Sequence, residues 1–129
     1  MSGDFVPLAQ AMGIEQIEAA PERVVTRMPV APNRQPAGLL AGGASAMLAE
    51  STASRAAMLH AARLGKVAVG AELNATHHAG VREGHVIATA SALHLGRSSA
   101  SYDVVITDEA GKRVCTARVL CLMIDRPHS

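Results

Sequence analysis

The sequence is poor in aromatic residues: its 129 residues include one Phe, one Tyr and no Trp. Proteins that bind nucleic acid commonly stack aromatic rings on bases and neutralise phosphates with clustered cations. A formal net charge of +1 offers no basic surface of that kind. No stretch reaches the roughly 18 consecutive apolar residues of a membrane-spanning helix. We therefore expect neither nucleic acid nor a membrane as a partner.

Cysteine is also scarce, and Cys115 and Cys121 are the two in the chain. Both fall in one predicted strand, where their separation spans about 20 Å at ~3.3 Å per residue. A disulfide requires Cα atoms within about 7 Å, so we expect two reduced, buried thiols. The N-terminal sequence MSGDFVPLAQAMG has an early Asp and lacks the basic and then apolar pattern of a secretory signal. These features together predict a cytoplasmic protein.

Apolar residues make up 49% of the chain, enough for the core of a single domain over residues 1–129. Helix-forming residues without internal Gly or Pro predict one helix, from Gly43 to about Ala62. Prolines and a glycine predict a loop over 31–38, and Gly111 predicts a hairpin turn over 108–112. Alternating apolar and polar positions predict strands in five segments: 13–30 (two strands), 65–78, 84–95, 98–107 and 113–124.

The number and order of these elements predict the fold class. One helix inserted early among about six strands, most of them joined by short turns, favours an α+β fold. A single helix on one face of a curled antiparallel sheet is the simplest way to bury it. Within the segment 65–78, the alternation predicts that Val67, Val69, Ala71 and Leu73 share one face of their strand.

The predicted helix carries one carboxylate, Glu50, on a face made otherwise of Gly, Ala and Ser. At about 100° per residue, positions 43, 46, 50, 54, 57 and 61 share this narrow face. Burying an unpaired carboxylate costs several kcal/mol, so either the face is solvated or the charge has a chemical role. In the first interpretation Glu50 is an ordinary surface residue. In the second it is a base or nucleophile, with Ser54 one turn below it.

A Gly42-Gly43 pair stands where this helix begins. Helix N-termini present unpaired N–H groups and the positive end of the helix dipole, and glycine lets a ligand approach the backbone closely. A carbonyl oxygen bound there would be polarised, and Glu50, two turns along, could act on the bound carbon or on a water. The alternative is that the two glycines only form a turn with unusual dihedral angles.

Other candidate residues give weaker signals. His77 and His78 are adjacent in a predicted strand and point to opposite faces, so they cannot both ligate one metal ion. Because Cys and carboxylates at ligand spacing are also lacking, we predict no metal site and no cofactor. Either histidine could still face a cleft. Arg97, at a strand junction, is either a phosphate contact or a solvated surface residue. The serines of the helix lack the His and Asp pattern of a serine hydrolase triad.

Three segments carry a resemblance to a known family: QPAGLLAGGASAMLAES (35–51), VAVGAELNATHHAGVREG (67–84) and LHLGRSSASYDVVITDEAGKRVCTAR (93–118). In this order they resemble the hotdog-fold acyl-CoA thioesterases, in the branch of the 4-hydroxybenzoyl-CoA and phenylacetic-acid-degradation thioesterases. Within it, the sequence is similar to enterobactin proofreading thioesterases. The resemblance implies a hotdog fold, a curved antiparallel sheet wrapped around one long helix. It also implies hydrolysis of an acyl-CoA, aryl-CoA or acyl-carrier-protein thioester.

The resemblance also implies roles for individual residues. Glu50 matches the catalytic carboxylate, Gly42 the residue whose backbone N–H binds the thioester oxygen, and Gln35 a glutamine near the thioester and the water. Ser54 matches a hydroxyl residue one turn after the carboxylate, and His77 matches a histidine that lines the acyl pocket. In this family the sites lie at a dimer interface, so we expect a homodimer or homotetramer. The other candidate substrate-binding residues are Ala41, Gly43, Arg97 and Ser98.

Ala41 departs from the family pattern, which usually reads His-Gly-Gly where this chain has Ala41-Gly42-Gly43. The missing histidine normally helps bind or polarise the thioester carbonyl, and losing one such donor costs about 10²–10³ in rate. The chain is therefore either a thioesterase with weakened chemistry or a non-catalytic acyl-CoA binding or regulatory module. A hotdog dehydratase is disfavoured, because that branch relies on a catalytic histidine with an acidic partner.

Overall fold

A computed structural model describes residues 6–127 of the chain. Residues 1–5, part of the segment in which a secretory pattern is lacking, lie outside the described residues. Within the described part, the one long helix is not apolar enough to cross a membrane. Along the chain the elements are α1 (Leu8–Ala11), β1 (Glu15–Ala20), β2 (Arg23–Pro29), a 3₁₀ turn (Ala31–Asn33), α2 (Gly42–Arg63), β3 (Lys66–His77), β4 (His85–Leu95), β5 (Ser99–Asp108) and β6 (Arg113–Asp125).

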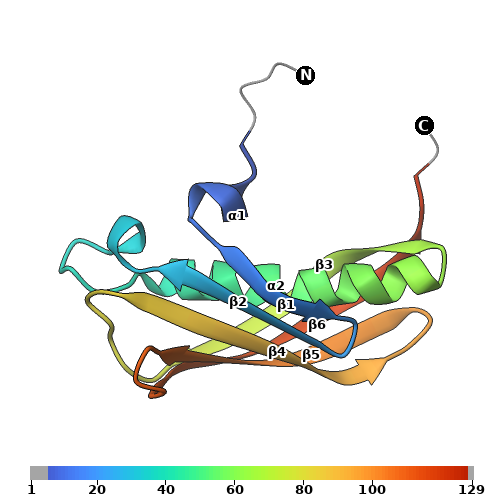
Figure 1. The fold of residues 1–129 in the computed structure, drawn as a ribbon. Helices are drawn as coiled ribbons and strands as arrows, with labels where there is room; N and C mark the ends of the chain where they lie inside the picture. Colours follow the sequence, from blue (N-terminus) through green and yellow to red (C-terminus); the bar gives the residue numbers. More distant parts are fainter. Residues whose placement is uncertain (1–5, 128–129) are drawn as a thin grey trace.

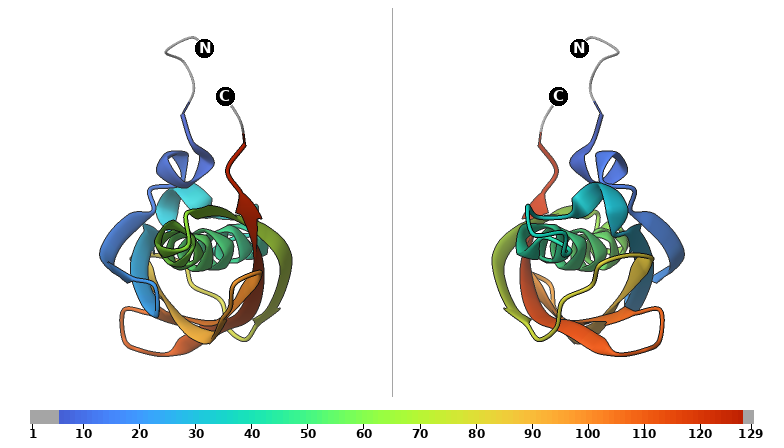
Figure 2. Two further views of the ribbon diagram at one scale, coloured as in Figure 1. Left: turned by 90° about the vertical axis from the view of Figure 1, so that its right-hand side faces the viewer. Right: turned by 90° about the vertical axis from the view of Figure 1, so that its left-hand side faces the viewer.

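The six strands form one antiparallel sheet in the order β1-β2-β4-β5-β6-β3. The sheet curls around α2, which lies along its concave face (Figure 1). Viewed along the helix, the strands enclose α2 from below and from both sides (Figure 2). This arrangement confirms the predicted α+β fold with one long helix held in a curved antiparallel sheet. The two edges of the sheet are β1 and β3.

Small side chains allow α2 to lie close to the sheet. Its buried face is mostly alanine, and Ala49, Ala53, Ala56 and Ala57 are fully buried. Alanine loses no side-chain conformational entropy on burial and is the best helix former. The sheet supplies the bulk that fills the space between the two layers. Its largest fully buried side chains are Tyr102, Met28, Ile106, Val24, Val86, Val104 and Val119.

The two cysteines confirm the predicted reduced thiols. Cys115 and Cys121 are both free and buried, and they lie on β6 opposite His77 and Gly70 of β3, respectively. Burial raises the pKa of both thiols.

β3 differs from the prediction in which of its residues share a face. The pairing register with β6 shifts between Gly70 and Glu72, as in a β-bulge. Ala68 packs against the core before the shift and Leu73 packs against it after the shift. The inward positions therefore change from even to odd numbers, because the bulge inserts one residue into a pattern of period two. The predicted shared face of Val67, Val69, Ala71 and Leu73 is wrong for this reason.

A buried hydrogen bond ties α2 to the sheet. The Thr26 and Thr52 hydroxyls lie 2.7 Å apart, and both residues are buried. Thr52 also donates to the carbonyl of Leu48, at 2.7 Å. Because the Thr52 hydroxyl has only one proton, Thr26 must be the donor in the contact between the two threonines. Removing Thr52 alone would leave the Thr26 donor buried without this partner.

We predict that Thr52→Val lowers the free energy of unfolding by about 1–3 kcal/mol, the usual cost of a buried donor left unsatisfied. The matched double variant Thr26→Val with Thr52→Val should recover most of that loss, because neither hydroxyl then remains. Urea unfolding followed by circular dichroism measures both values. Additive losses in the double variant would contradict this account of the pair.

Candidate active site

Helix α2 begins at Gly42, and its first turn presents free backbone donors. Ala41 is the N-cap residue, with extended dihedral angles and no capping hydrogen bond from its side chain. Within residues 6–127, no acceptor pairs with the N–H of Gly42 or Gly43. A methyl group placed on Gly43 would meet no heavy atom within 4 Å. This helix end therefore offers open N–H groups where the positive end of the helix dipole lies.

The loop before α2 is fixed by backbone hydrogen bonds. Ala41 N–H donates to the carbonyl of Asn33 at 2.9 Å, and Leu40 N–H donates to Val81 at 2.7 Å. Gln35 lies in this loop, where its N–H donates to the carbonyl of Leu39 at 2.7 Å. Its side-chain oxygen accepts the N–H of Ala37, so the side-chain NH₂ remains as the group that could reach a ligand.

His77 and His78 point to opposite faces of the sheet, as predicted. A methyl carbon placed on Gly42 would lie 3.3 Å from Nε2 of His77, so this imidazole covers the start of α2. His78 instead bonds the hydroxyl of Thr116, at 2.9 Å. Of the two histidines, His77 is therefore the one beside the start of α2.

Glu50 is half-buried on the flank of α2 and faces the bulge of β3. A methyl carbon placed on Gly70 would lie 3.8 Å from Cδ of Glu50 and 4.0 Å from its Oε1. Cys121 of β6 is the pairing partner of Gly70 of β3. Burial raises the pKa of the Cys121 thiol, the Ser54 hydroxyl opposes this rise by hydrogen bonding, and the negative charge of Glu50 adds to it. Glu50, Ser54 and Cys121 are therefore close neighbours.

Glu50 and Gly42 are not brought together within one chain. They are eight positions apart on α2, a rise of about 12 Å. The Glu50 carboxyl lies beside Gly70 and the start of α2 lies beside His77, and these β3 residues are about 23 Å apart along an extended strand. The N–H groups of the first helical turn also point away from the helix, toward its N-terminal side. A ligand oxygen on Gly42 thus lies beyond the reach of Glu50 of the same chain.

The turn between β4 and β5, which contains Arg97 and Ser98, lies near the C-terminal end of α2, opposite its start (Figure 1). The preceding carbonyl, that of Gly96, accepts a hydrogen bond from His60 in the last turns of α2, at 2.7 Å. Lys66 Nζ donates to the carbonyl of Arg97 at 3.1 Å, which ties this turn to the start of β3. Gly42 and His60 are separated by about 27 Å along the helix. Within one chain, Arg97 and Ser98 therefore lie far from the start of α2.

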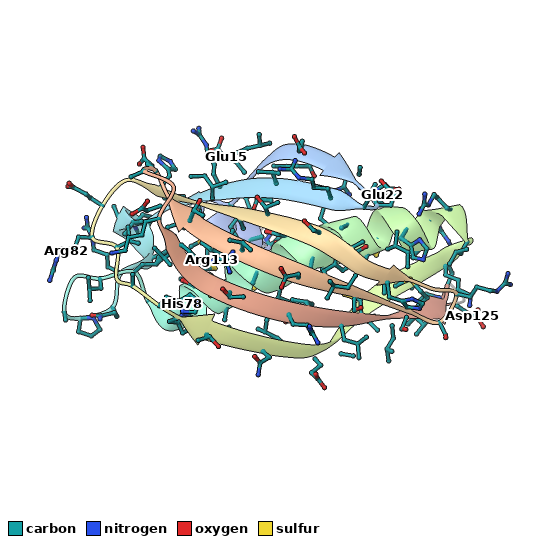
Figure 3. The ribbon with its side chains drawn as sticks, turned by 90° about the horizontal axis from the view of Figure 1, so that it is seen from below. Glu15, Glu22, His78, Arg82, Arg113 and Asp125 are labelled. Atoms are coloured by element: carbon teal, nitrogen blue, oxygen red, sulfur yellow. The ribbon has the colours of Figure 1, made fainter. Side chains whose placement is uncertain are left out.

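A polar depression of about 420 Å³ lies on the sheet away from Glu50. The depression is lined by Glu72, Asn74, Thr76, Asp103, Thr116, Ala117 and Arg118. Figure 3 views the molecule from below the sheet, with His78 and Arg113 near one end and Asp125 at the other.

No group of three or more His, Cys, Asp or Glu side chains among the described residues is arranged to hold a metal ion.

Two neighbours of Glu50, namely Gly70 and Cys121, were missed in the sequence analysis. A glycine inside a strand pattern signals a bulge or a close approach by another group, and Gly70 gave that signal. Cys121 gave none, because its closeness to Glu50 arises from the pairing of β3 with β6.

The chain is similar to proteins of known family over most of its length. Residues 37–115 match the Thioesterase superfamily. The proofreading thioesterase EntH of Cronobacter turicensis is 43% identical over 113 residues, which cover 87% of this chain and 82% of that protein. A Pseudomonas aeruginosa thioesterase, solved as a glutamine-to-alanine variant, is 37% identical with a TM-score of 0.86, covering 91% of this chain and 85% of that one. A Haemophilus influenzae thioesterase is 34% identical with a TM-score of 0.85, covering 94% of this chain and 86% of that one.

Proposed function

The chain belongs to the Thioesterase superfamily and is a thioester hydrolase of hotdog fold, and we propose that it cleaves an acyl-CoA thioester to a free acid and a thiol, with Glu50 and Gly42 as the central groups. An aryl-CoA or an acyl-carrier-protein thioester is the nearest variant of this substrate. The observation that carries the proposal is the uncapped start of α2, which offers N–H donors to a carbonyl oxygen.

In the proposed reaction the Gly42 N–H donates to the thioester carbonyl oxygen and stabilises the negative charge that develops there. Glu50 takes a proton from a water, whose oxygen bonds to the carbonyl carbon, or it attacks that carbon itself. The C–S bond then breaks and the thiolate takes up a proton. If Glu50 is the nucleophile, this step leaves an anhydride on Glu50, which a water hydrolyses to the free acid and the Glu50 carboxylate. Gln35 and Ser54 orient the water and the carboxylate, His77 lines the acyl site, and Ala41 and Gly43 border the bound carbonyl.

We propose that two copies of the chain pair through β3. This strand is a sheet edge of 12 residues whose one neighbouring strand within residues 6–127 is β6. A long edge with free N–H and C=O groups is a template for another strand. The other edge, β1, is half as long and carries ion pairs from Glu15 and Glu18 to arginines of β2. Charged, short edges of this kind resist pairing. A homotetramer would add a second contact between such dimers.

Pairing through β3 also accounts for the separation of Glu50 from Gly42. A two-fold axis makes the two β3 strands antiparallel, and an axis between Leu73 and Asn74 would place the Gly70 region of one copy opposite the His77 end of the other. Glu50 of one copy then approaches Gly42 of the second. The same axis carries the start of β3, with Arg97 and Ser98, toward the helix N-terminus of the second copy. We therefore propose Arg97 and Ser98 as contacts to the CoA phosphates in the neighbouring site.

We also propose a cytoplasmic location for the protein. A cytoplasmic location accords with the two free thiols. The non-catalytic binding module stays as a second candidate function for one reason, the absence of a histidine at Ala41. The relatives named as thioesterases favour hydrolysis over binding alone.

We predict that Glu50→Gln lowers kcat by at least about 10³-fold, because the amide can neither take a proton nor attack the carbon. Release of free thiol from acetyl-CoA, benzoyl-CoA and a medium-chain acyl-CoA measures the rate. The matched control is Glu18→Gln, which changes an exposed carboxylate on the far edge of the sheet and should keep the parent rate. Turnover by Glu50→Gln within severalfold of the parent would contradict the role proposed for Glu50.

We predict that Ala41→His raises kcat by roughly 10-fold or more with little change in KM, because the restored donor acts mainly in the transition state. Steady-state kinetics on one aryl and one aliphatic CoA thioester make the comparison, with Ala41→Ser as a control of smaller size. If neither substrate gains, the weakened-thioesterase interpretation of Ala41 fails and the binding module is favoured.

A further inference from the structure

Neither the backbone nor crowding explains why residue 70 is a glycine. Its φ lies outside the left-handed region that favours glycine. A Cβ atom built there would have the Glu50 side chain as its nearest contact, at the ordinary distances of 3.8–4.0 Å. A glycine inside a strand is also less stable than alanine by about 0.5–1 kcal/mol. The chain would thus tolerate a side chain at this position as far as its own packing is concerned.

What glycine does provide is open space beside the carboxyl group of Glu50. Gly70 is exposed, and its missing side chain would point toward α2 rather than to the outer face. The surroundings of this space are small. Cys121 of β6 is paired with Gly70 of β3, and the Ser54 hydroxyl interacts with the Cys121 thiol. The space is therefore bordered by a carboxylate, a hydroxyl and a thiol, and no bulky side chain fills it.

The size of this space matches one part of a bound thioester. A reacting carboxylate lies about 3–3.5 Å from the carbon that it attacks. The next carbon of the acyl group is one bond further from the carboxylate. Its distance from the carboxylate is then about 4 Å, the distance at which a Cβ atom of residue 70 would lie. A water bonded to the carboxylate lies closer, at about 2.8 Å. A side chain at position 70 would thus collide with the acyl group before it displaced the water.

We propose that Gly70 is the residue that sets how bulky the carbon next to the thioester carbonyl can be. The inference rests on the proposed function. In this proposal the first atoms of the acyl group occupy the space between Gly70 and the Glu50 carboxyl group. Acyl groups that are branched or carry a ring at this carbon, such as benzoyl, therefore depend on the glycine most. A straight two-carbon acyl group places only a methyl group in this space, so it depends on the glycine least.

The test compares Gly70→Ala and Gly70→Val with the parent on benzoyl-CoA and acetyl-CoA. We expect the ratio of kcat/KM for benzoyl-CoA to that for acetyl-CoA to fall by at least 10-fold in Gly70→Val and by less in Gly70→Ala. One excluded methyl group typically changes selectivity by about 10–200-fold. Activity on acetyl-CoA should stay within about threefold, and thermal unfolding checks that both variants fold. Ala71→Val, at the exposed next position of the same bulge, is the control and should leave the ratio unchanged.

An unchanged ratio in both Gly70 variants, or an equal loss on both substrates, overturns the inference while leaving the proposed function intact. If Gly70→Val does not fold, the ratio for Gly70→Ala decides. If the parent cleaves neither thioester, the proposed function fails instead. Binding of two uncleavable thioethers, S-benzyl-CoA and S-ethyl-CoA, then decides the inference: selective loss of the benzyl compound in Gly70→Val supports it, and equal affinities contradict it.

Discussion

The close contact between the alanine face of α2 and the concave side of the sheet determines where every candidate group lies. Because the buried positions of the helix are so small, the 22-residue helix lies deep in the sheet and spans about 33 Å. Distances along it are fixed by helix geometry. Gly42 is at one end, Glu50 two turns along, and the turn that carries Arg97 at the other end. No side-chain rotation can join these groups within one chain.

This constraint gives the edge strand β3 its importance. β3 passes from the turn near Arg97, past the flank of Glu50, to the start of α2 at His77. In the proposed dimer, β3 of the second copy runs in the opposite direction. Glu50 and the turn with Arg97 of one chain would then lie near the start of α2 of the other. The same pairing satisfies the free backbone groups of a long edge. In the proposed dimer, assembly and chemistry would thus depend on one strand.

Much of the fold could be predicted because its signals are local. Helix formers from Gly43 onward, the Gly111 turn and the alternation in β4, β5 and β6 each specify one element, and the order of elements leaves little choice of class. The short helix Leu8–Ala11 escaped prediction because four residues give no periodicity. The exchange of faces in β3 also escaped: Gly70 signals a bulge, but the position of the register shift depends on pairing with β6. For the candidate site, the helix pattern and the family resemblance predicted Glu50 and Gly42, but their separation depends on the tertiary arrangement.

The central claim is that Gly42 and Glu50 of different copies form one site, and a mixed dimer tests it most directly. Glu50→Gln removes the carboxylate. Gly42→Pro removes the N–H at the first helical position, where proline is well tolerated, and Gly42→Ala is its control because it keeps the N–H. With two tags, the dimer holding one Glu50→Gln chain and one Gly42→Pro chain can be purified. We predict that it regains about half of the parent activity, from one intact site of two. A mixed dimer as inactive as each variant alone would contradict the account.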